Sequence, residues 1–330
     1  MIGLIPSYSL IGEFAIAMLF TLRIIQGFSY GGEMSGAIVI VSEFSEKWRG
    51  LSCGLISVSG MLGVLAAVLT HSIITSYLSP EQLVMYGWRI AFIFGGIIIF
   101  HSYFSRQALY NSPDFMRLLA KRKKPGAFMS YFQRYKLISL LCVLMAMGTL
   151  GYGGIFIAYL PTYCLTHCEQ FSGDISTLMI ILMFAAAVGS ILGGLLSEVF
   201  SYKKVYVVIT IIGAALIIPA FKTISYSGYS TMQALSGCAI IYGAVIAIYY
   251  RYLVEIFPMQ IRYTAVAIIY NIAVALFIGL SPAFLSIVLP LLPTPLLPAY
   301  LLLSAFCIQI LFVIFVEIKR RSLPKLDLET

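Results

Sequence analysis

Charged side chains are scarce in this sequence. Its 330 residues include 21 Lys or Arg and 13 Asp or Glu, so that only 10% of the chain is charged while 61% is hydrophobic. Soluble domains are about one quarter charged and about one half apolar. A chain with this composition has too little polar surface to cover itself in water, which excludes an ordinary soluble domain.

The residue sets that enzymes need are also absent from the sequence. It contains no nucleophile-base-acid set, no phosphate-binding loop and no metalloprotease spacing, so we expect no enzymatic activity and no cofactor. Cys164, His167 and Cys168 lie close together, but a fourth metal ligand is not near them. We therefore expect no metal site. The first residues lack a basic region and a cleavage site, so we expect no cleavable signal peptide.

What the sequence has in abundance is long, continuous apolar runs. About 20 apolar residues are needed for an α-helix to cross a bilayer, and a helix satisfies its backbone polar groups internally. A transmembrane β-barrel would show short alternating segments instead. The sequence therefore predicts an all-α, polytopic bundle of transmembrane helices in a lipid bilayer. The nine predicted spans are residues 10–40, 50–76, 88–105, 137–163, 173–197, 204–222, 231–253, 262–288 and 297–317.

Basic residues gather in alternate loops between these runs, which predicts the orientation of the chain. Most of them lie in the segment 106–136, in three short turns on the same side and in the tail that begins at Lys319. Lys and Arg mark the cytoplasmic side of a membrane protein, so we expect the segment and the tail to be cytoplasmic and Met1 to lie outside, in a cell (inner or plasma) membrane. Charges placed in this way do not form a phosphate-binding face, so we expect no nucleic-acid partner.

The spans fall into two groups around the basic segment. We expect residues 1–105 to form part of one helical bundle, 106–136 to be a linker, 137–318 to form a six-helix bundle and 319–330 to be a tail. Transporters are commonly built from two related bundles, and the first bundle here is three helices shorter than the second.

A short internal repeat relates the two groups. The Tyr-Gly pair at 30–31 precedes Glu43 by the same interval as the Tyr-Gly pair at 242–243 precedes Glu255. Each glutamate ends a predicted span, and each is followed by an arginine that opens the next one. The match supports a duplication of the helical bundle.

Several segments share the pattern of one transporter family. Residues 23–33 read Arg-Ile-Ile-Gln-Gly-Phe-Ser-Tyr-Gly-Gly-Glu, 87–92 read Gly-Trp-Arg-Ile-Ala-Phe, and 255–258 read Glu-Ile-Phe-Pro. Together with the turn at 43–50 and Tyr-Leu-Pro-Thr-Tyr at 159–163, they resemble the major facilitator superfamily, and within it the metabolite:proton symporters that include proline/betaine transporters. The resemblance implies alternating access, with a small organic solute and protons as partners.

The sequence departs from the family pattern at several places. The first three helices of the family have no counterpart. In the loop at 193–204, Glu198 stands for the usual acid, but Ser201-Tyr202 replaces the expected Gly-Arg pair. Met61 follows Gly60 where antiporters carry proline, which favours symport.

Arg23 and Glu33 are charged residues inside the first predicted span. A charge near the bilayer centre costs about 3 kcal/mol. In one interpretation Arg23 faces a water-filled cavity and holds a carboxylate, while Glu33 carries the proton and Gln26 of the same motif assists. In the other interpretation these residues form a packed polar cluster. Arg23 and Glu33 lie about 15 Å apart along a helix axis, too far for an ion pair.

Charged residues also flank the predicted cytoplasmic turns. We expect them to act as latches of a gate that break and reform between the inward-open and outward-open states. The alternative is ordinary charge at helix ends in solvent, which contributes little. The gate candidates are Glu43, Arg49, Glu198, Glu255 and Arg262.

Tyrosines recur at intervals of seven on two spans that the resemblance places beside the cavity. Tyr152 and Tyr159 are one such pair, and Tyr242 and Tyr249 are the other. On an α-helix each pair shares a face, and an aromatic face attracts a quaternary ammonium group. The alternative is packing or an interfacial belt. Asn271 is a further candidate for a polar contact with the solute.

Three functions stay open from the sequence. The first is proton-coupled symport of a small solute such as proline or betaine, or of an organic di- or tricarboxylate. The second is a truncated remnant that no longer transports. The third is one part of a split transporter, with the missing helices on a separate chain.

Overall fold

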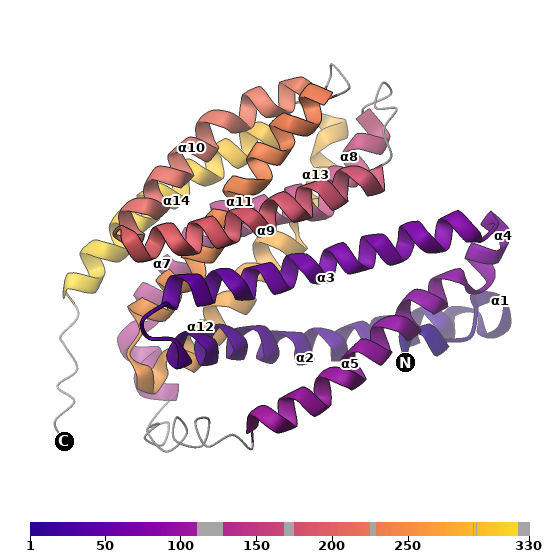
Figure 1. The fold of residues 1–330 in the computed structure, drawn as a ribbon, viewed down its shortest axis with the longest axis horizontal. Helices are drawn as coiled ribbons and strands as arrows, with labels where there is room; N and C mark the ends of the chain where they lie inside the picture. Colours follow the sequence, from indigo (N-terminus) through magenta and orange to yellow (C-terminus); the bar gives the residue numbers. More distant parts are fainter. Residues whose placement is uncertain (111–127, 168–174, 225–228, 293, 295, 323–330) are drawn as a thin grey trace. The chain divides into compact units, whose positions relative to one another are not determined.

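The computed structural model describes residues 1–110, 128–167, 175–224, 229–292, 294 and 296–322. All regular structure within these ranges is helical, and nine helical segments are long and apolar enough to cross a membrane. The prediction of an all-α bundle of membrane helices is confirmed (Figure 1). The predicted linker 106–136 and tail 319–330 lie largely outside the described residues.

Eleven helical segments lie in the described chain as far as Val199. They are η1 (Ile2–Leu4), α1 (Tyr8–Ile11), α2 (Glu13–Phe44), α3 (Arg49–Tyr77), α4 (Pro80–Gln82) with the π-helical η2 (Leu83–Gly87) and α5 (Trp88–Tyr110), α7 (Phe128–Gly153) with the π-helical η3 (Gly154–Tyr159) and α8 (Leu160–His167), and α9 (Ile175–Val199). The remaining helices are α10 (Tyr202–Thr223), α11 (Tyr229–Ile256), α12 (Met259–Ala273) with the π-helical η5 (Val274–Gly279) and α13 (Ser281–Leu291), and α14 (Leu297–Ser322).

The first span begins later than the sequence predicts. Gly12 has a φ of 56°, a conformation that side chains rarely adopt, and it separates the short α1 from α2. The membrane helix therefore starts at Glu13 instead of residue 10. The apolar residues Leu10 and Ile11 just before the break extend the hydropathy pattern across it.

The chain forms two compact units that divide α2 and α3 between them. The first unit contains Met1–Met34 and Ala66–Gly126, and the second contains Ser35–Leu65 and Ala127–Thr330. The halves of α2 and α3 that adjoin their connecting turn thus belong with the C-terminal helices. These units differ from the division at 106–136 that the sequence suggests, which stays a prediction.

In the first unit, the N-terminal segment packs on the start of α5. Gly3 lies so close to this helix that a Cβ atom on it would come within 3.0 Å of Phe92 Cβ and 3.1 Å of the Arg89 carbonyl oxygen. The Arg89 guanidinium donates to the Ile5 carbonyl oxygen at 2.9 Å and lies over the Trp88 ring, 4.4 Å from its centroid. Arg89 therefore fixes the segment before α1 against α5.

In the second unit, α9 and α11 cross at glycines. A Cβ atom on Gly243 would lie 1.8 Å from the Ala186 carbonyl oxygen, and one on Gly189 would lie 2.0 Å from that of Ile240. Small residues let membrane helices approach until their backbones touch. This contact makes α9 and α11 the tightest helix pair that we find in the unit.

A chain of buried polar side chains joins α7, α10 and α14. Thr149 Oγ1 lies 2.7 Å from the Tyr206 hydroxyl and donates to Gln309 Oε1 at 3.0 Å. Gln309 Nε2 donates to Thr210 Oγ1 at 2.8 Å. All four side chains are fully buried, and their mutual hydrogen bonds offset the cost of placing polar groups inside the helical bundle.

The glycine crossing predicts opposite effects for two alanine substitutions on α11. Gly243→Ala places a methyl group against the α9 backbone and should lower the free energy of unfolding by about 1–3 kcal/mol. A Cβ atom on Gly237 meets nothing within 4 Å, so Gly237→Ala should leave stability unchanged or raise it, because alanine favours helix. Thermal unfolding of the two variants in one detergent measures the difference, and equal midpoints would contradict the crossing.

Candidate functional site

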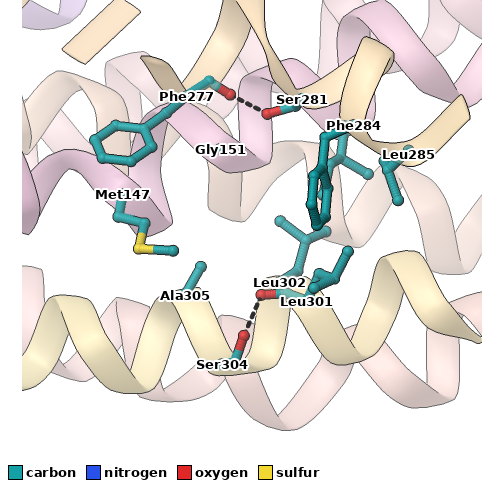
Figure 2. A pocket seen from close by; sticks show the side chains of 11 residues that line it. Met147, Gly151, Phe277, Ser281, Phe284, Leu285, Leu301, Leu302, Ser304 and Ala305 are labelled. Carbon is teal, nitrogen blue, oxygen red and sulfur yellow. Dashed lines mark hydrogen bonds between the residues drawn. The ribbon is translucent and has the colours of Figure 1, made fainter. Parts of the chain in front are cut away.

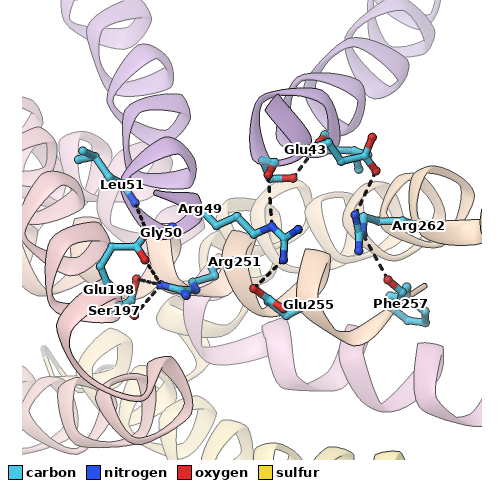
Figure 3. A network of polar contacts seen from close by, with 12 residues as sticks. Glu43, Arg49, Gly50, Leu51, Ser197, Glu198, Arg251, Glu255, Phe257 and Arg262 are labelled. Carbon is cyan, nitrogen blue, oxygen red and sulfur yellow. Dashed lines mark hydrogen bonds and ion pairs between the residues drawn. The ribbon is translucent and has the colours of Figure 1, made fainter. Parts of the chain in front are cut away.

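Six charged residues form ion pairs at one end of the second unit, which we call the basic end. Here α2, α9 and α11 end, and α3, α10 and α12 begin (Figure 3). Three arginines and three glutamates make the pairs, and five of these six residues are the gate candidates of the sequence. The basic end is the side that the loop charges predict to be cytoplasmic.

The first pair joins the end of α2 to the start of α12. Arg262 Nη1 lies 3.1 Å from Glu43 Oε1, and the Glu43 side chain is only 1% exposed. The Arg262 Nε also donates to the Phe257 carbonyl oxygen at 3.2 Å, which holds the guanidinium against the turn that precedes its own helix. A pair this deeply buried depends on both partners, because removing one leaves the other charge uncompensated.

The second pair joins the start of α3 to the end of α11. Arg49 Nη1 lies 3.2 Å from Glu255 Oε1, with side-chain exposures of 22% and 23%. Arg49 Nε donates to the Ser42 carbonyl oxygen at 3.3 Å, at the end of α2. Water reaches this pair, so the loss of one partner costs less here than in the Glu43–Arg262 pair.

The two pairs connect the copies of the internal repeat crosswise. Glu43 and Arg49 flank one turn, and Glu255 and Arg262 flank the other, yet each glutamate pairs with the arginine of the opposite turn. The sequence identified these four residues, but it could not say which charges meet. These crosswise ion pairs join the α2–α3 turn to the α11–α12 turn.

Glu198 at the end of α9 caps the start of α3. Its Oε1 accepts hydrogen bonds from the backbone amides of Gly50 and Leu51, the latter at 3.2 Å. Backbone amides in the first turn of a helix lack partners within the helix and carry partial positive charge, so a carboxylate stabilises them. A Cβ atom on Gly50 would lie 2.0 Å from Ser197 Oγ, so only glycine allows this close approach.

Arg251 completes the cluster and was not among the gate candidates. Its Nη1 lies 3.1 Å from Glu198 Oε2 and donates to the hydroxyl of Ser197 at 3.0 Å. The sequence shows it only as one of the basic residues near a turn. The available signal was its spacing, because Arg251 precedes Glu255 by four residues on α11 and the two side chains lie on one helix face.

The three transport candidates lie on α2 in the first unit, with exposed side chains. Arg23 Nη1 donates to Gln26 Oε1 at 3.1 Å, and the guanidinium lies 5.5 Å from the centre of the Phe92 ring. Arg23 also lines a hollow of about 340 Å³ together with Trp88 and Phe92. Arg23 and Gln26 thus act as one polar group beside an aromatic wall, while Glu33 lies further along the helix.

The four candidate tyrosines lie in the core of the second unit. Tyr152 donates to the Cys238 carbonyl oxygen at 2.8 Å, and its ring meets that of Tyr242 edge-on at 5.4 Å. Tyr159 and Tyr249 are also buried, and the Tyr249 hydroxyl has no hydrogen-bond partner among the described residues. Asn271 Nδ2 donates to the Ala267 carbonyl oxygen of its own helix at 2.8 Å. In this conformation the tyrosines pack against their neighbours, as the packing interpretation requires.

An apolar cavity of about 130 Å³ lies between α7 with η3, η5 with α13, and α14 (Figure 2). The hydroxyls of Ser281 and Ser304 line it, but both already donate to backbone carbonyl oxygens. Ser281 donates to Phe277, and Ser304 donates to Leu301. The described lining therefore offers a charged solute no free side-chain donor, and the cavity is a poor site for a zwitterion.

Comparison with known proteins shows the family. Residues 1–282 match the model of the Major Facilitator Superfamily. The chain belongs to this superfamily. It is thus a member of a transporter family and not of an enzyme family, as the sequence predicted.

Curated relatives confirm the resemblance to proline/betaine transporters. A putative proline/betaine transporter of Staphylococcus aureus (strain MSSA476) is 27% identical over 99% of this chain, which covers 72% of that protein. The proline/betaine transporter of Salmonella typhimurium is 29% identical over 92% of the chain and 63% of its own length. The glycine betaine/proline/ectoine/pipecolic acid transporter OusA of Dickeya dadantii is 28% identical over 96% of the chain and 65% of its own length.

Solved structures confirm the fold. The fucose:proton symporter FucP of E. coli covers 86% of this chain with a TM-score of 0.60 at 17% identity. A second structure of FucP, in the outward conformation, gives a TM-score of 0.61 at 18% identity. In both comparisons the chain covers 72% of the symporter.

The two crosswise ion pairs predict unequal losses of stability. Arg262→Gln removes the positive charge beside the buried Glu43 and should cost about 3–5 kcal/mol. Arg49→Gln acts on a pair that water reaches and should cost about 1 kcal/mol or less. Thermal unfolding of the purified variants measures both effects. The double variant Glu43→Gln/Arg262→Gln should recover part of the larger loss, and an equal loss for the two single variants would contradict the order of burial.

Proposed function

We propose that this chain carries out proton-coupled symport of a small zwitterionic solute by alternating access, with the ion pairs of the basic end as its gate. The observation that carries the proposal is the crosswise pairing of the two repeated turns. A closed gate needs contacts that link equivalent elements of the two repeats and that water can replace when they separate. Both ion pairs link the two repeated turns, and the partly exposed Arg49–Glu255 pair is one that water can replace.

Glu198 adds an element to this gate that the crosswise pairs lack. It binds the first backbone amides of α3 as well as Arg251, so its carboxylate couples the end of α9 to the start of α3. When α3 moves away, those amides lose their acceptor and meet water instead. The cost of separation is then modest, as an exchange between two states of similar free energy requires.

The solute and the proton are assigned to α2 and to the tyrosines. Arg23 with Gln26 offers a cationic donor pair for a carboxylate, and Glu33 is the candidate proton carrier. A quaternary ammonium group needs an aromatic surface, which the tyrosines at 152, 159, 242 and 249 would supply in another state of the bundle. The names of the relatives support proline and betaines as the class of solute. An organic carboxylate is the alternative, because Arg23 suits it equally.

The charge pattern supports an orientation in which the basic end, the linker 106–136 and the C-terminal tail face the cytoplasm. The chain spans 63–72% of the length of the relatives described above. Transport by this chain alone and transport together with a separate segment are therefore both part of the proposal, and the uptake experiment separates them.

We expect this chain, expressed in a host without its own osmolyte uptake, to accumulate labelled proline or glycine betaine in a way that an ionophore abolishes. Glu33→Gln should reduce the ionophore-sensitive part of uptake by about tenfold or more, because a glutamine side chain cannot take up and release a proton. Glu46→Gln, which changes an exposed glutamate in the α2–α3 turn, is the matched control and should retain uptake.

Two outcomes would contradict the proposal. Uptake that ignores the ionophore rejects proton coupling. No uptake of any osmolyte or organic acid by a chain that is correctly inserted rejects transport by this chain alone. Uptake that returns on co-expression with a segment carrying three further helices then identifies a split transporter, and its continued absence supports a remnant.

The alkylation of a native cysteine, Cys53, can report the opening of the gate. Cys53 is fully buried on α3, next to the ion pairs of the basic end. In a variant whose other five cysteines are replaced, Arg262→Ala should raise the rate of Cys53 alkylation several-fold, because the closed state loses a contact. Lys204→Ala removes an exposed positive charge from the same end and should not change the rate. Equal rates for parent and Arg262→Ala would reject the latch.

A further inference from the structure

We propose that Tyr202 is a positioning residue of the gate: its ring is the surface on which the Arg251 guanidinium lies, and it thereby keeps Glu198 on the start of α3. The inference rests on the proposed function only in calling this cluster a gate. The contacts that carry it belong to the described part of the second unit. Tyr202 is the first residue of α10 and directly follows the turn after α9.

The Arg251 guanidinium has polar partners on one side and an aromatic ring on another. Its carbon lies 5.3 Å from the centre of the Tyr202 ring, within the distance at which an arginine is attracted to an aromatic face. The hydrogen bonds and the ion pair described for it all use Nη1. Nε is buried and has no hydrogen-bond partner among the described residues.

This uneven pattern makes the ring necessary. A guanidinium held at one nitrogen is free to pivot about that atom, and its planar shape lets it stack on an aromatic side chain. The Tyr202 ring lies against the guanidinium and opposes this pivot. The ion pair with Glu198, 14% and 12% exposed on the two sides, is therefore fixed by an aromatic contact as well as by charge.

The ring is itself fixed by a second cluster that reaches α14. Tyr252 of α11 meets it edge-on, with centroids 5.4 Å apart and planes at 81°. The Tyr252 hydroxyl donates to Glu317 of α14, and Lys203, the neighbour of Tyr202, pairs with the same carboxylate. Helices α10, α11 and α14 thus hold the ring in place, and the position of Arg251 depends on all three.

Tyr202 also occupies the position at which the sequence departs from the expected Gly-Arg pair. A second arginine here would stand beside Arg251 and repel it, whereas the tyrosine ring attracts it. The substitution of an aromatic residue for a cation therefore leaves a working contact in the loop between α9 and α10. An aromatic contact with Arg251 thus stands where the family pattern has a second cation.

The first experiment compares two substitutions by Cys53 alkylation in the variant without the other five cysteines. Tyr202→Phe keeps the ring and should alkylate at the parent rate. Tyr202→Leu keeps an apolar side chain without an aromatic face and should raise the rate by about fivefold, the size of a partly buried cation–π contact. Equal rates for Phe and Leu would overturn the proposal, because simple packing would then explain the residue.

The second experiment asks whether Tyr202 acts through Arg251. Tyr202→Leu, Arg251→Gln and the double variant form a thermal-unfolding cycle in detergent. The Leu substitution should lower the midpoint in the parent and have little effect in Arg251→Gln, because its partner is absent. Additive shifts would overturn the proposal. This readout needs no transport, so a chain that fails to take up solute still decides the role of Tyr202.

Discussion

The arrangement of the basic end depends on one constraint: charges at helix ends that are partly removed from water must find partners of opposite sign. Glu43 is almost fully buried, and the structure meets its charge with an arginine from a turn far away in the sequence. The other ion pairs of this cluster follow the same rule. Arg49 and Arg251 each join two helix ends, and Glu198 serves an arginine and a helix start together. Electrostatic pairing, more than apolar packing, determines which helix ends meet there.

The helices behind this end have the opposite character. The crossing of α9 and α11 is made by backbones in contact, with no room for a single added methyl group at Gly243. Buried hydrogen bonds join α7, α10 and α14. Contacts of this kind do not deform gradually, so they hold the helices that they join in one arrangement. In the proposed gate, the ion pairs at its rim are the contacts that would change.

The sequence predicted the spans well because a bilayer imposes one length and one composition on every helix that crosses it. It could not locate the break at Gly12, since the apolar Leu10 and Ile11 extend the hydropathy pattern back across it. It identified Glu43, Arg49, Glu255 and Arg262 through a repeat, but a repeat suggests pairing within each copy, and the structure pairs across them. Arg251 had only its four-residue spacing from Glu255 as a signal, and its contact with Tyr202 joins α10 to α11, which no linear pattern describes.

The π-helical segment η3 connects two of the tyrosines that are seven residues apart, and it changes their relative direction. Tyr152 precedes η3 and Tyr159 is its last residue. Each hydrogen bond in a π-helix spans one residue more than in an α-helix, so seven residues no longer bring the chain back to the same direction. The two rings are therefore turned apart about the helix axis, whereas Tyr242 and Tyr249 on the regular α11 stay aligned. If η3 tightened into an α-helix, the rings of Tyr152 and Tyr159 would rotate into register. A local change in winding, with no movement of a whole helix, would then be enough to bring the two rings to one face.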